Sequence, residues 1–225
     1  VLDEDTILRE IIPHLSWGKR GKKSDPRLVL CIVQLILYRL KTGCQWRFIP
    51  VKAYISDSYS WQSVFHHFNK WSKDGSWEQA WSNQLRLQRS ALRLRTIQLD
   101  GSQTYCKRGG EAVGYQGRRH GMTSNTLFIS DERGAILAIS RAQSGNHHDS
   151  YDIATHFESF MAQFNRIGID PNGLIMNADA GFDSKDFRKY CNQNGIIDNI
   201  DINKRNAKTI DYEYFLDDKL YKERF

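Results

Sequence analysis

The sequence has few cysteines and no long apolar run, and each absence excludes a class of protein. The four cysteines form no C-x-x-C pair and have no histidine at zinc-ligand spacing, which argues against a zinc ribbon or a disulfide framework. The longest mostly apolar run, Leu28 to Leu37, is too short to span a bilayer, and Arg39 follows it. The acidic opening segment is unlike a secretory signal. We therefore expect a reduced, cytoplasmic protein with no membrane partner.

Composition indicates a folded protein with an uneven charge distribution. The chain has 225 residues, of which 40% are hydrophobic and 12% aromatic, enough for one large or two small domains. The net charge is +6, but residues 1–95 carry 16 Lys and Arg against 8 Asp and Glu, whereas residues 96–225 carry 16 against 18. This asymmetry favours a polyanion-binding front half joined to a carboxylate-bearing rear half. Ordinary surface charge would explain it equally well.

The front half, residues 1–95, has the periodicity of helices. Leu28–Leu40 is apolar on nearly every face, which predicts a buried central helix ending at Thr42-Gly43. Ser56-Asp57-Ser58 offers caps for a following helix, and apolar residues recur behind it at helical spacing. We predict a small all-α, helix-turn-helix-like DNA-binding domain. A solvated helix surface would account for its polar face as well. The recurring apolar residues are Trp61, Val64, Phe65, Phe68 and Trp71.

From residue 96 the period changes to that of strands, giving the order strand-strand-strand-helix-strand-helix-strand. Asp149 or Ser150 is expected to cap the first of these helices, and Asp183 or Ser184 the second. Three antiparallel strands followed by a right-handed crossover place the fourth strand beside the first and parallel to it. The sequence thus predicts an α/β catalytic domain over residues 96–225 with a mixed sheet. The expected strands are Thr96–Asp100, Thr126–Ser130, Ala135–Ser140, Leu174–Met176 and Ile196–Ile200.

Two aspartates, Asp100 and Asp179, each end a short apolar run and are followed by glycine within two residues. A carboxylate at the end of a strand is an oxygen ligand on a rigid support, and Mg²⁺ demands oxygen ligands. If the two strands are neighbours, the carboxylates can straddle a pair of ions about 3.5–4 Å apart. The residues therefore predict a catalytic metal site, and the basic chain points to a nucleic-acid phosphodiester as substrate.

Two basic segments are candidate phosphate contacts. One runs from Lys107 and Arg108 to Arg118 and Arg119 and is rich in glycine, which lets a backbone approach phosphates closely. The other contains Lys19, Arg20, Lys22 and Lys23. A flexible, solvated loop is the alternative for both segments.

The triplet His147-His148-Asp149 is a further candidate for metal binding. Adjacent histidines on an extended stretch point to opposite sides, which argues against joint ligation. A helix-capping Asp149 is the favoured interpretation, and a role beside the active site is the alternative.

Several segments resemble bacterial insertion-sequence DDE transposases. In the front half, Lys41–Pro50 is similar to that family's T-G-C-x-W-R-x-[LI]-P stretch, and the aromatic pattern of Trp61–Trp77 follows it. In the rear half, Leu99–Ser102 resembles the flank of the first catalytic aspartate, and Ala178–Ser184 resembles the pattern A-D-x-G-[YF]-D-S around the second. Tyr221–Arg224 is similar to the opening of the family's Y-x₂-R-x₃-E motif. The motifs occur in the order of the family.

The resemblance implies a ribonuclease-H-like catalytic domain behind the helical domain. Asp100 and Asp179 would be catalytic ligands of two Mg²⁺ or Mn²⁺ ions, and Tyr221 and Arg224 would contact DNA. The partners implied are double-stranded DNA, both element ends and target, and a second subunit in a homodimer. A nucleoid-associated cytoplasmic location would follow. A stand-alone nuclease of the same fold is disfavoured by the basic helical front half.

The third acidic ligand of the motif falls three positions beyond Phe225. On a helix, Glu223 lies about 140° from that position and does not replace it. Position 180, where such proteins often have Lys or Arg, is Ala. We therefore expect a truncated, inactive transposase, with a catalytically dead DNA-binding remnant, a repressor or an interfering partner, as the alternative.

Overall fold

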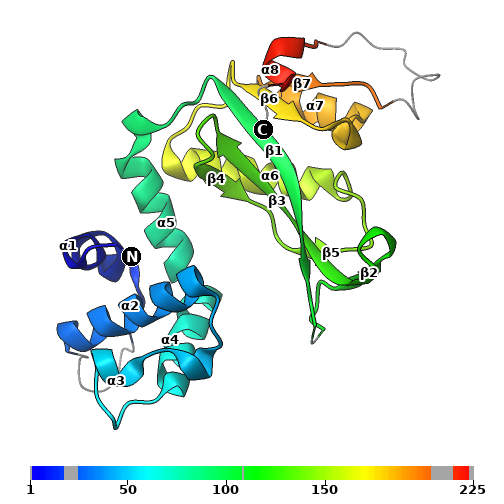
Figure 1. Cartoon of the computed structure of the whole chain (residues 1–225). Coiled ribbons are helices and arrows are strands. Elements are labelled where there is room, and N and C mark those ends of the chain that lie inside the picture. Colours follow the sequence, from blue (N-terminus) through cyan, green and yellow to red (C-terminus); the bar gives the residue numbers. More distant parts are fainter. Residues whose placement is uncertain (1, 18–24, 108, 204–214, 223–225) are drawn as a thin grey trace. The chain divides into compact units, whose positions relative to one another are not determined.

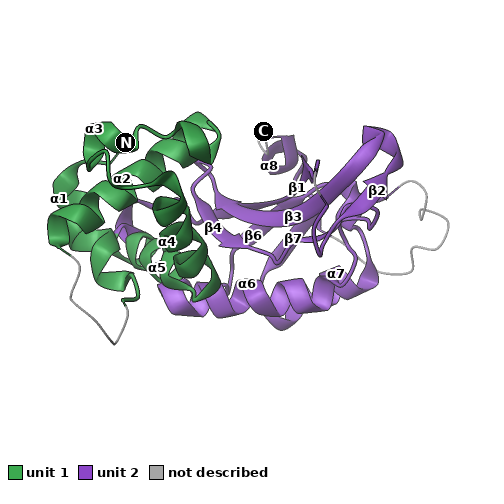
Figure 2. Ribbon diagram, turned by 90° about the horizontal axis from the view of Figure 1, so that it is seen from below, with its two compact units in different colours: residues 1–87 green, residues 88–225 purple. Residues whose placement is uncertain are grey.

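The structure is a computed structural model that describes residues 2–17, 25–107, 109–203 and 215–222 (Figure 1). It divides into two compact units, Val1–Leu87 and Gln88–Phe225, which Figure 2 colours separately. The segment 88–95, grouped with the front half on sequence, thus belongs to the second unit. Among the helices described, none is long and apolar enough to cross a membrane.

All the regular secondary structure described in the front unit is helical. Its longest helix, α2, begins at Pro26 behind the cap Asp25, whose side chain accepts a hydrogen bond from the Arg27 backbone N–H. It ends at Gly43, which adopts φ of 70°, a conformation open to glycine at little cost. The helices of the unit are α1 (Glu4–Thr6), η1 (Ile7–Ile11), η2 (Ile12–His14), α2 (Pro26–Thr42), η3 (Trp46–Phe48), α3 (Val51–Tyr54), α4 (Trp61–Lys73) and α5 (Ser76–Leu87).

Helix α2 supplies much of the core of the front unit. Its Val33, Leu35 and Ile36 are fully buried, as are Val64 and Trp71 on α4, so the sequence prediction of a buried central helix is confirmed. The predicted cap of the following helix is wrong. Ser60, rather than the 56–58 stretch, caps α4, because its hydroxyl lies close enough to accept from the Ser63 N–H at 3.3 Å.

The second unit is built on one mixed sheet in the order β2-β3-β1-β6-β7, with β4 and β5 also paired to β3. Strand β1 is antiparallel to β3 and parallel to β6, and β6 is parallel to β7. The predicted return of the fourth strand beside the first is confirmed, as is the mixed α/β class. The elements are η4 (Arg89–Ala91), β1 (Thr96–Tyr105), β2 (Gly114–Gln116), η5 (Gly117–Arg119), β3 (Gly121–Asp131), β4 (Ile136–Ile139), β5 (Gln143–Ser144), α6 (Ile153–Ile167), β6 (Ile175–Ala178), η6 (Ala180–Phe182), α7 (Lys185–Gln193), β7 (Ile197–Ile200) and α8 (Asp218–Lys222).

Helices cover both faces of this sheet. Figure 2 shows α6 and α7 along one face and α8 against the other. The α6 side is the apolar one, since Phe157, Phe160 and Phe164 of this helix are buried together with Ile97 and Leu99 of β1. Burial of such aromatic side chains is the main favourable contribution to the stability of the unit.

Two helix starts in this unit test the predicted caps. Ser184 caps α7, accepting from the Phe187 N–H at 3.2 Å, as predicted. The cap of α6 is Asp152 rather than Asp149 or Ser150. Asp152 adopts φ of 49°, a left-handed conformation that Asp tolerates better than most residues, and its side chain accepts from the Thr155 hydroxyl. Asp149 is therefore not explained by capping.

Candidate active site

The sheet register brings Asp100 and Asp179 to neighbouring strands. Leu99 pairs with Ala178 at the end of the parallel β1–β6 ladder, and each aspartate is the next residue along its strand. Neighbouring strands lie about 4.8 Å apart. Residues 79 positions apart in the chain thus lie side by side where the parallel ladder ends, as the metal hypothesis requires, although β1 itself continues past Asp100 to Tyr105, beyond the strand end expected from the sequence.

Glycine follows each aspartate for a structural reason. The Gly101 N–H donates to Asp100 Oδ1 at 2.8 Å, and the Gly181 N–H donates to Asp179 Oδ1 at 2.7 Å. A Cβ at Gly181 would lie 2.8 Å from the same Asp179 oxygen, so a larger residue there would displace the carboxylate. Asp179 is half-buried and Asp100 exposed. Both carboxylates are therefore oriented by backbone before any ligand arrives.

Asp179 also lines a cavity of about 550 Å³ at this edge of the sheet. The other walls come from the end of β1, from the turn at Arg118 and from the segment that precedes α6. The lining is polar and carries both charge signs, as a site for a phosphate group and a cation requires. The residues that line it include Gln103, Gln116, Arg118, His147, His148, Asp149 and Ser184. Asp100 is not one of them.

Asp100 faces the side of the sheet on which α8 lies. Successive side chains of a strand point to opposite faces, so Asp100 shares its face with Gln98, which pairs with Asn177. The Asn177 side-chain amide donates to the Leu220 carbonyl of α8 at 3.0 Å. Helix α8, which carries Tyr221, thus lies on the same face as Asp100.

Two buried asparagines dock α8, and the sequence reasoning overlooked them. Asn199 donates to Asn177 Oδ1 at 2.7 Å and accepts from the Asp217 backbone N–H at 2.7 Å. Exposure is 1% for Asn177 and 0% for Asn199. A buried amide is costly unless it is hydrogen-bonded, so an Asn within each of two apolar strands was a usable signal for a contact at this place.

The turn after Asp179 is held by a buried ion network. Arg188 of α7 donates to Asp183 Oδ1 from Nε at 3.0 Å and from Nη2 at 2.9 Å. It also pairs with Asp198 of β7 and donates to the Ile200 carbonyl. Burial raises the pKa of the Asp198 carboxyl, although Arg188 opposes that shift. The network fixes the backbone between Asp179 and α7.

The predicted DNA-contacting residues are found in different places. Arg118 lines the cavity with Asp179. Lys107 and Arg119 are exposed, and Tyr221 lies on α8. The segment from Lys107 to Arg119 was expected to be a loop, but residues 114–116 form the strand β2. The strand β1 before it continues to Tyr105. Six predicted residues lie outside the described residues: Lys19, Arg20, Lys22, Lys23, Arg108 and Arg224.

The donors present suit a hard divalent cation. Carboxylates are the ligand type that Mg²⁺ and Mn²⁺ take, and the two aspartates at the end of the β1–β6 ladder would supply two of the ligands. Within the described ranges, no three His, Cys, Asp or Glu side chains are grouped so as to hold a metal ion. His147 stacks on Tyr151 with ring centroids 3.7 Å apart, and His148 Nδ1 lies 2.7 Å from the Ser150 hydroxyl. The two histidines therefore have other partners.

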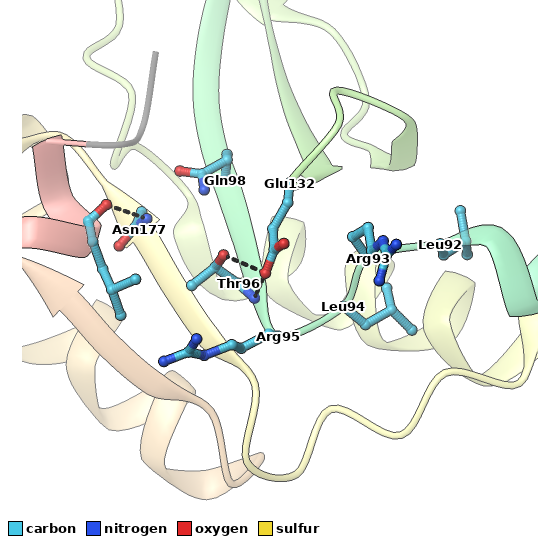
Figure 3. A pocket seen from close by; sticks show the side chains of 9 residues that line it. Leu92, Arg93, Leu94, Arg95, Thr96, Gln98, Glu132 and Asn177 are labelled. Atoms are coloured by element: carbon cyan, nitrogen blue, oxygen red, sulfur yellow. Dashed lines mark hydrogen bonds between the residues drawn. The ribbon is translucent and has the colours of Figure 1, made fainter.

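A second pocket, of about 610 Å³, lies at the opposite end of β1 (Figure 3). Its walls are Leu92–Thr96, Gln98, Glu132, Asn177 and Leu220. Glu132 accepts from the Thr96 N–H and hydroxyl, which ties the β3–β4 turn to the start of β1 (Figure 3). Neither aspartate contributes to this pocket, so we assign the candidate active site to the other end of the strand.

One family of known proteins is similar to the front unit. Residues 5–81 match the family model described as "Putative transposase of IS4/5 family (DUF4096)". No curated protein matches the chain. The match covers most of the helical unit and ends before the sheet.

Solved structures similar to the chain are complexes of the Mos1 transposase. The chain aligns with the Mos1 paired-end complex with left transposon end at 11% identity and a TM-score of 0.34, over 81% of this chain and 60% of that one. The chain aligns with the Mos1 mariner paired-end complex with Mn at 11% identity and a TM-score of 0.31, again over 81% of this chain and 60% of that one. These values are too low to assign residue roles by superposition. The chain spans about 60% of the length of these solved transposases.

The family match falls on the part of the chain in which the T-G-C-x-W-R-x-[LI]-P stretch and the aromatic pattern were found. It is independent of the two aspartates, which lie outside the matched residues. The match agrees with the resemblance to insertion-sequence transposases, and residues 5–81 of this chain are similar to the putative transposases of the IS4/5 family.

Proposed function

We propose that this chain acts in a DDE transposase of an insertion sequence, a polynucleotidyl transferase that cleaves phosphodiester bonds at the ends of its element and transfers the strands to target DNA. The observation that carries the proposal is the pairing of Leu99 with Ala178, because each is followed by an aspartate that a glycine N–H orients, and the two aspartates therefore lie beside each other where the parallel β1–β6 ladder ends. The family match of the front unit agrees with it.

In this proposal Asp100 and Asp179 hold two divalent ions, Mg²⁺ or Mn²⁺. Such ions, when bound, activate an attacking oxygen and stabilise the leaving oxygen of an in-line displacement. The chain's own contribution is orientation, because the Gly101 and Gly181 N–H groups fix one oxygen of each carboxylate. Arg118 lines the same cavity as Asp179 and would bind a DNA phosphate through the N–H donors of its planar guanidinium group.

DNA binding is proposed for both units. The domain of residues 1–95 would supply most of the affinity through its basic residues, including Lys19, Arg20, Lys22 and Lys23. Lys107, Arg108 and Arg119 of the catalytic domain, together with Tyr221 and Arg224, would contact the strand near the carboxylates. The bound partners would be the terminal repeats and the target duplex, held by a homodimer at the nucleoid.

A second candidate is a DNA-binding remnant without catalysis. It is favoured by the arrangement of the side chains, because among the described residues no three His, Cys, Asp or Glu side chains are grouped so as to hold a metal ion. Such a protein would occupy element ends and act as a repressor or as an interfering subunit.

The test combines cation and DNA binding by a polypeptide of these 225 residues. Mn²⁺ bound at the site is followed by electron paramagnetic resonance, and duplex binding by fluorescence anisotropy at several salt concentrations. Asp100→Asn and Asp179→Asn should each abolish Mn²⁺ binding, because each removes a carboxylate ligand. The control Glu158→Gln, which removes the same charge from an exposed position of α6, should leave it intact.

DNA affinity should survive all three substitutions and fall steeply with salt, since each phosphate contact releases counterions. Mn²⁺ binding that neither aspartate affects would exclude the metal site. Duplex binding that is absent or insensitive to salt would exclude both candidate functions.

A further inference from the structure

Asp149 has no structural role of the kind its position suggested. It was expected to cap α6, but the cap is Asp152, three residues later. Asp149 is half-buried and lines the cavity that Asp179 also lines. A half-buried carboxylate without a capping function calls for another explanation.

The Asp149 carboxylate is held beside the backbone that carries Asp100. A Cβ built at Gly101 would lie 2.7 Å from Asp149 Oδ1, so the carboxylate rests directly on the strand at the residue after Asp100. Only glycine at position 101 allows this approach without displacement. Asp149 is thus in contact with β1 at Gly101 and shares a cavity with Asp179, the residue that follows β6.

A buried amide orients this carboxylate. Asn125 of β3 donates from Nδ2 to Asp149 Oδ1 at 2.6 Å, and Asn125 is fully buried. The second polar atom of this side chain, Oδ1, is buried and has no hydrogen-bond partner in the described part of the chain. Asn125 is therefore not at an optimum for stability, since an unsatisfied buried acceptor costs about 1–3 kcal/mol.

The loop that presents Asp149 is firmly attached to the sheet. The Gln116 side chain donates to the Gly145 carbonyl at 2.8 Å, and Gly145 packs so closely on Thr123 that a Cβ would lie 1.9 Å from its hydroxyl oxygen. Asn125 pairs in register with Gln143 of β5, whose Oε1 lies 3.2 Å from His156 Nε2 on α6. Asp149 is therefore preorganised rather than carried on a free loop.

One oxygen of this carboxylate is engaged and the other is not. Asn125 occupies Oδ1, whereas no donor among the described residues is bonded to Oδ2. An ionised carboxylate only accepts hydrogen bonds, so the group it fits in the cavity is a donor. Of the groups on a DNA strand end next to a metal-held phosphate, the terminal hydroxyl is such a donor.

We infer that Asp149 is a substrate-binding residue whose Oδ2 accepts a hydrogen bond from the 3′-hydroxyl of a DNA strand end placed in the cavity beside Asp179. The inference rests on the proposed function and deepens it, because it assigns the position of the strand end. Arg118, on another wall of the same cavity, is placed to neutralise the adjoining phosphate.

The experiment compares two DNA duplexes that differ in one atom. One ends in a 3′-hydroxyl and the other in a 3′-deoxy terminus, and each is titrated into the 225-residue polypeptide with Ca²⁺ present to prevent cleavage. The wild-type protein should bind the hydroxyl end about tenfold more tightly, a difference of about 1.4 kcal/mol. The same comparison is made for Asp149→Asn and for the control Asp152→Asn.

Asp149→Asn should lose the preference, because the amide keeps an acceptor for Asn125 but turns a donor toward the cavity. Asp152→Asn removes an equal charge three residues away, at an exposed left-handed position that Asn also tolerates, and should retain it. Thermal unfolding of each variant identifies any loss of fold. Should Asp149→Asn not fold, Asp149→Ser takes its place, since it also removes the carboxylate and should likewise lose the preference.

Equal affinity of the wild-type protein for both duplexes would overturn the inference while leaving the transposase proposal standing. So would a preference that Asp149→Asn retains. Absence of any duplex binding would overturn both.

Discussion

Arg188 offers a sharp test of how the turn behind Asp179 is held. This side chain is 8% exposed and bonds two carboxylates, Asp183 at 4% exposure and Asp198. Arg188→Met keeps the volume of the side chain but leaves both carboxylates without their cation. Breaking a buried pair by removing one partner costs about 3–5 kcal/mol. At about 2–4 °C per kcal/mol, the second unit should unfold roughly 10 °C earlier.

The tryptophans allow the two units to be followed separately. All six lie between residues 17 and 81, so tryptophan fluorescence reports the front unit alone. Hydrogen exchange of the β6 and β7 amides reports the second unit. Arg188→Met should accelerate that exchange and leave the fluorescence transition unchanged. Lys189→Met, the same change at the exposed neighbour, should alter neither by more than about 0.5 kcal/mol.

The loss of stability caused by Arg188→Met should also depend on pH, and the pKa of Asp198 determines the direction of that dependence. Burial raises the pKa of this carboxyl in the folded protein above its ordinary value of 3.8. The folded state therefore binds the proton more tightly, and stability rises as pH falls through the raised folded pKa. Without Arg188 this effect grows, so the cost of Arg188→Met should shrink as the pH falls from neutral toward the raised pKa of Asp198. A cost below about 1 kcal/mol at neutral pH, or one that increases on acidification, would refute the reasoning.

Three further outcomes are expected. Gly101→Ala should lower the free energy of unfolding in urea by about 1–3 kcal/mol, because the new methyl group meets Asp149. The control Gly117→Ala has open space around it and should be close to neutral. Equal effects of the two substitutions would contradict the Asp149 contact. Asn199→Leu should increase hydrogen exchange in α8, since it removes bonds to Asp217 and Asn177; unchanged protection of α8 would show that other contacts hold the helix. A polypeptide of these 225 residues should not cleave element ends in Mg²⁺, because no three His, Cys, Asp or Glu side chains of the described residues are grouped so as to hold a metal ion. Mg²⁺-dependent cleavage that Glu223→Gln abolishes would contradict this expectation and show that Glu223 is a metal ligand.

Strand order and parallel pairing were predictable because they follow from general rules. A long connection that contains a helix favours a right-handed parallel return, which predicts that Leu174–Met176 lies beside Thr96–Asp100, as the structure shows. Caps with strong local signals, such as Ser184, were predictable too. The two catalytic candidates, Asp100 and Asp179, depended on this topology and on motif likeness.

The parts that were missed depend on distant contacts. Strand β2 contains Gly114, which local propensity disfavours, yet close packing against Ser144 and Asn146 permits only glycine there. The helix caps Ser60 and Asp152 lie two to three residues after other residues that are equally suitable as caps. Tertiary packing, rather than the local sequence, therefore determines where each helix begins. Asn177 and Asn199 are polar interruptions whose partners, the backbone of Asp217 and Leu220, no periodicity reveals.

The way in which α8 is docked has a consequence for sequence variation. Asn177 and Asn199 bond backbone atoms of Asp217 and Leu220, and α8 contributes no buried residue among those described. The two asparagines therefore hold α8 through its backbone atoms, and this contact does not depend on which side chains α8 carries. Homologous proteins should tolerate many residues at positions 218–220 while keeping both asparagines. Proline should not be tolerated at position 217, because it lacks the N–H that donates to Asn199 Oδ1.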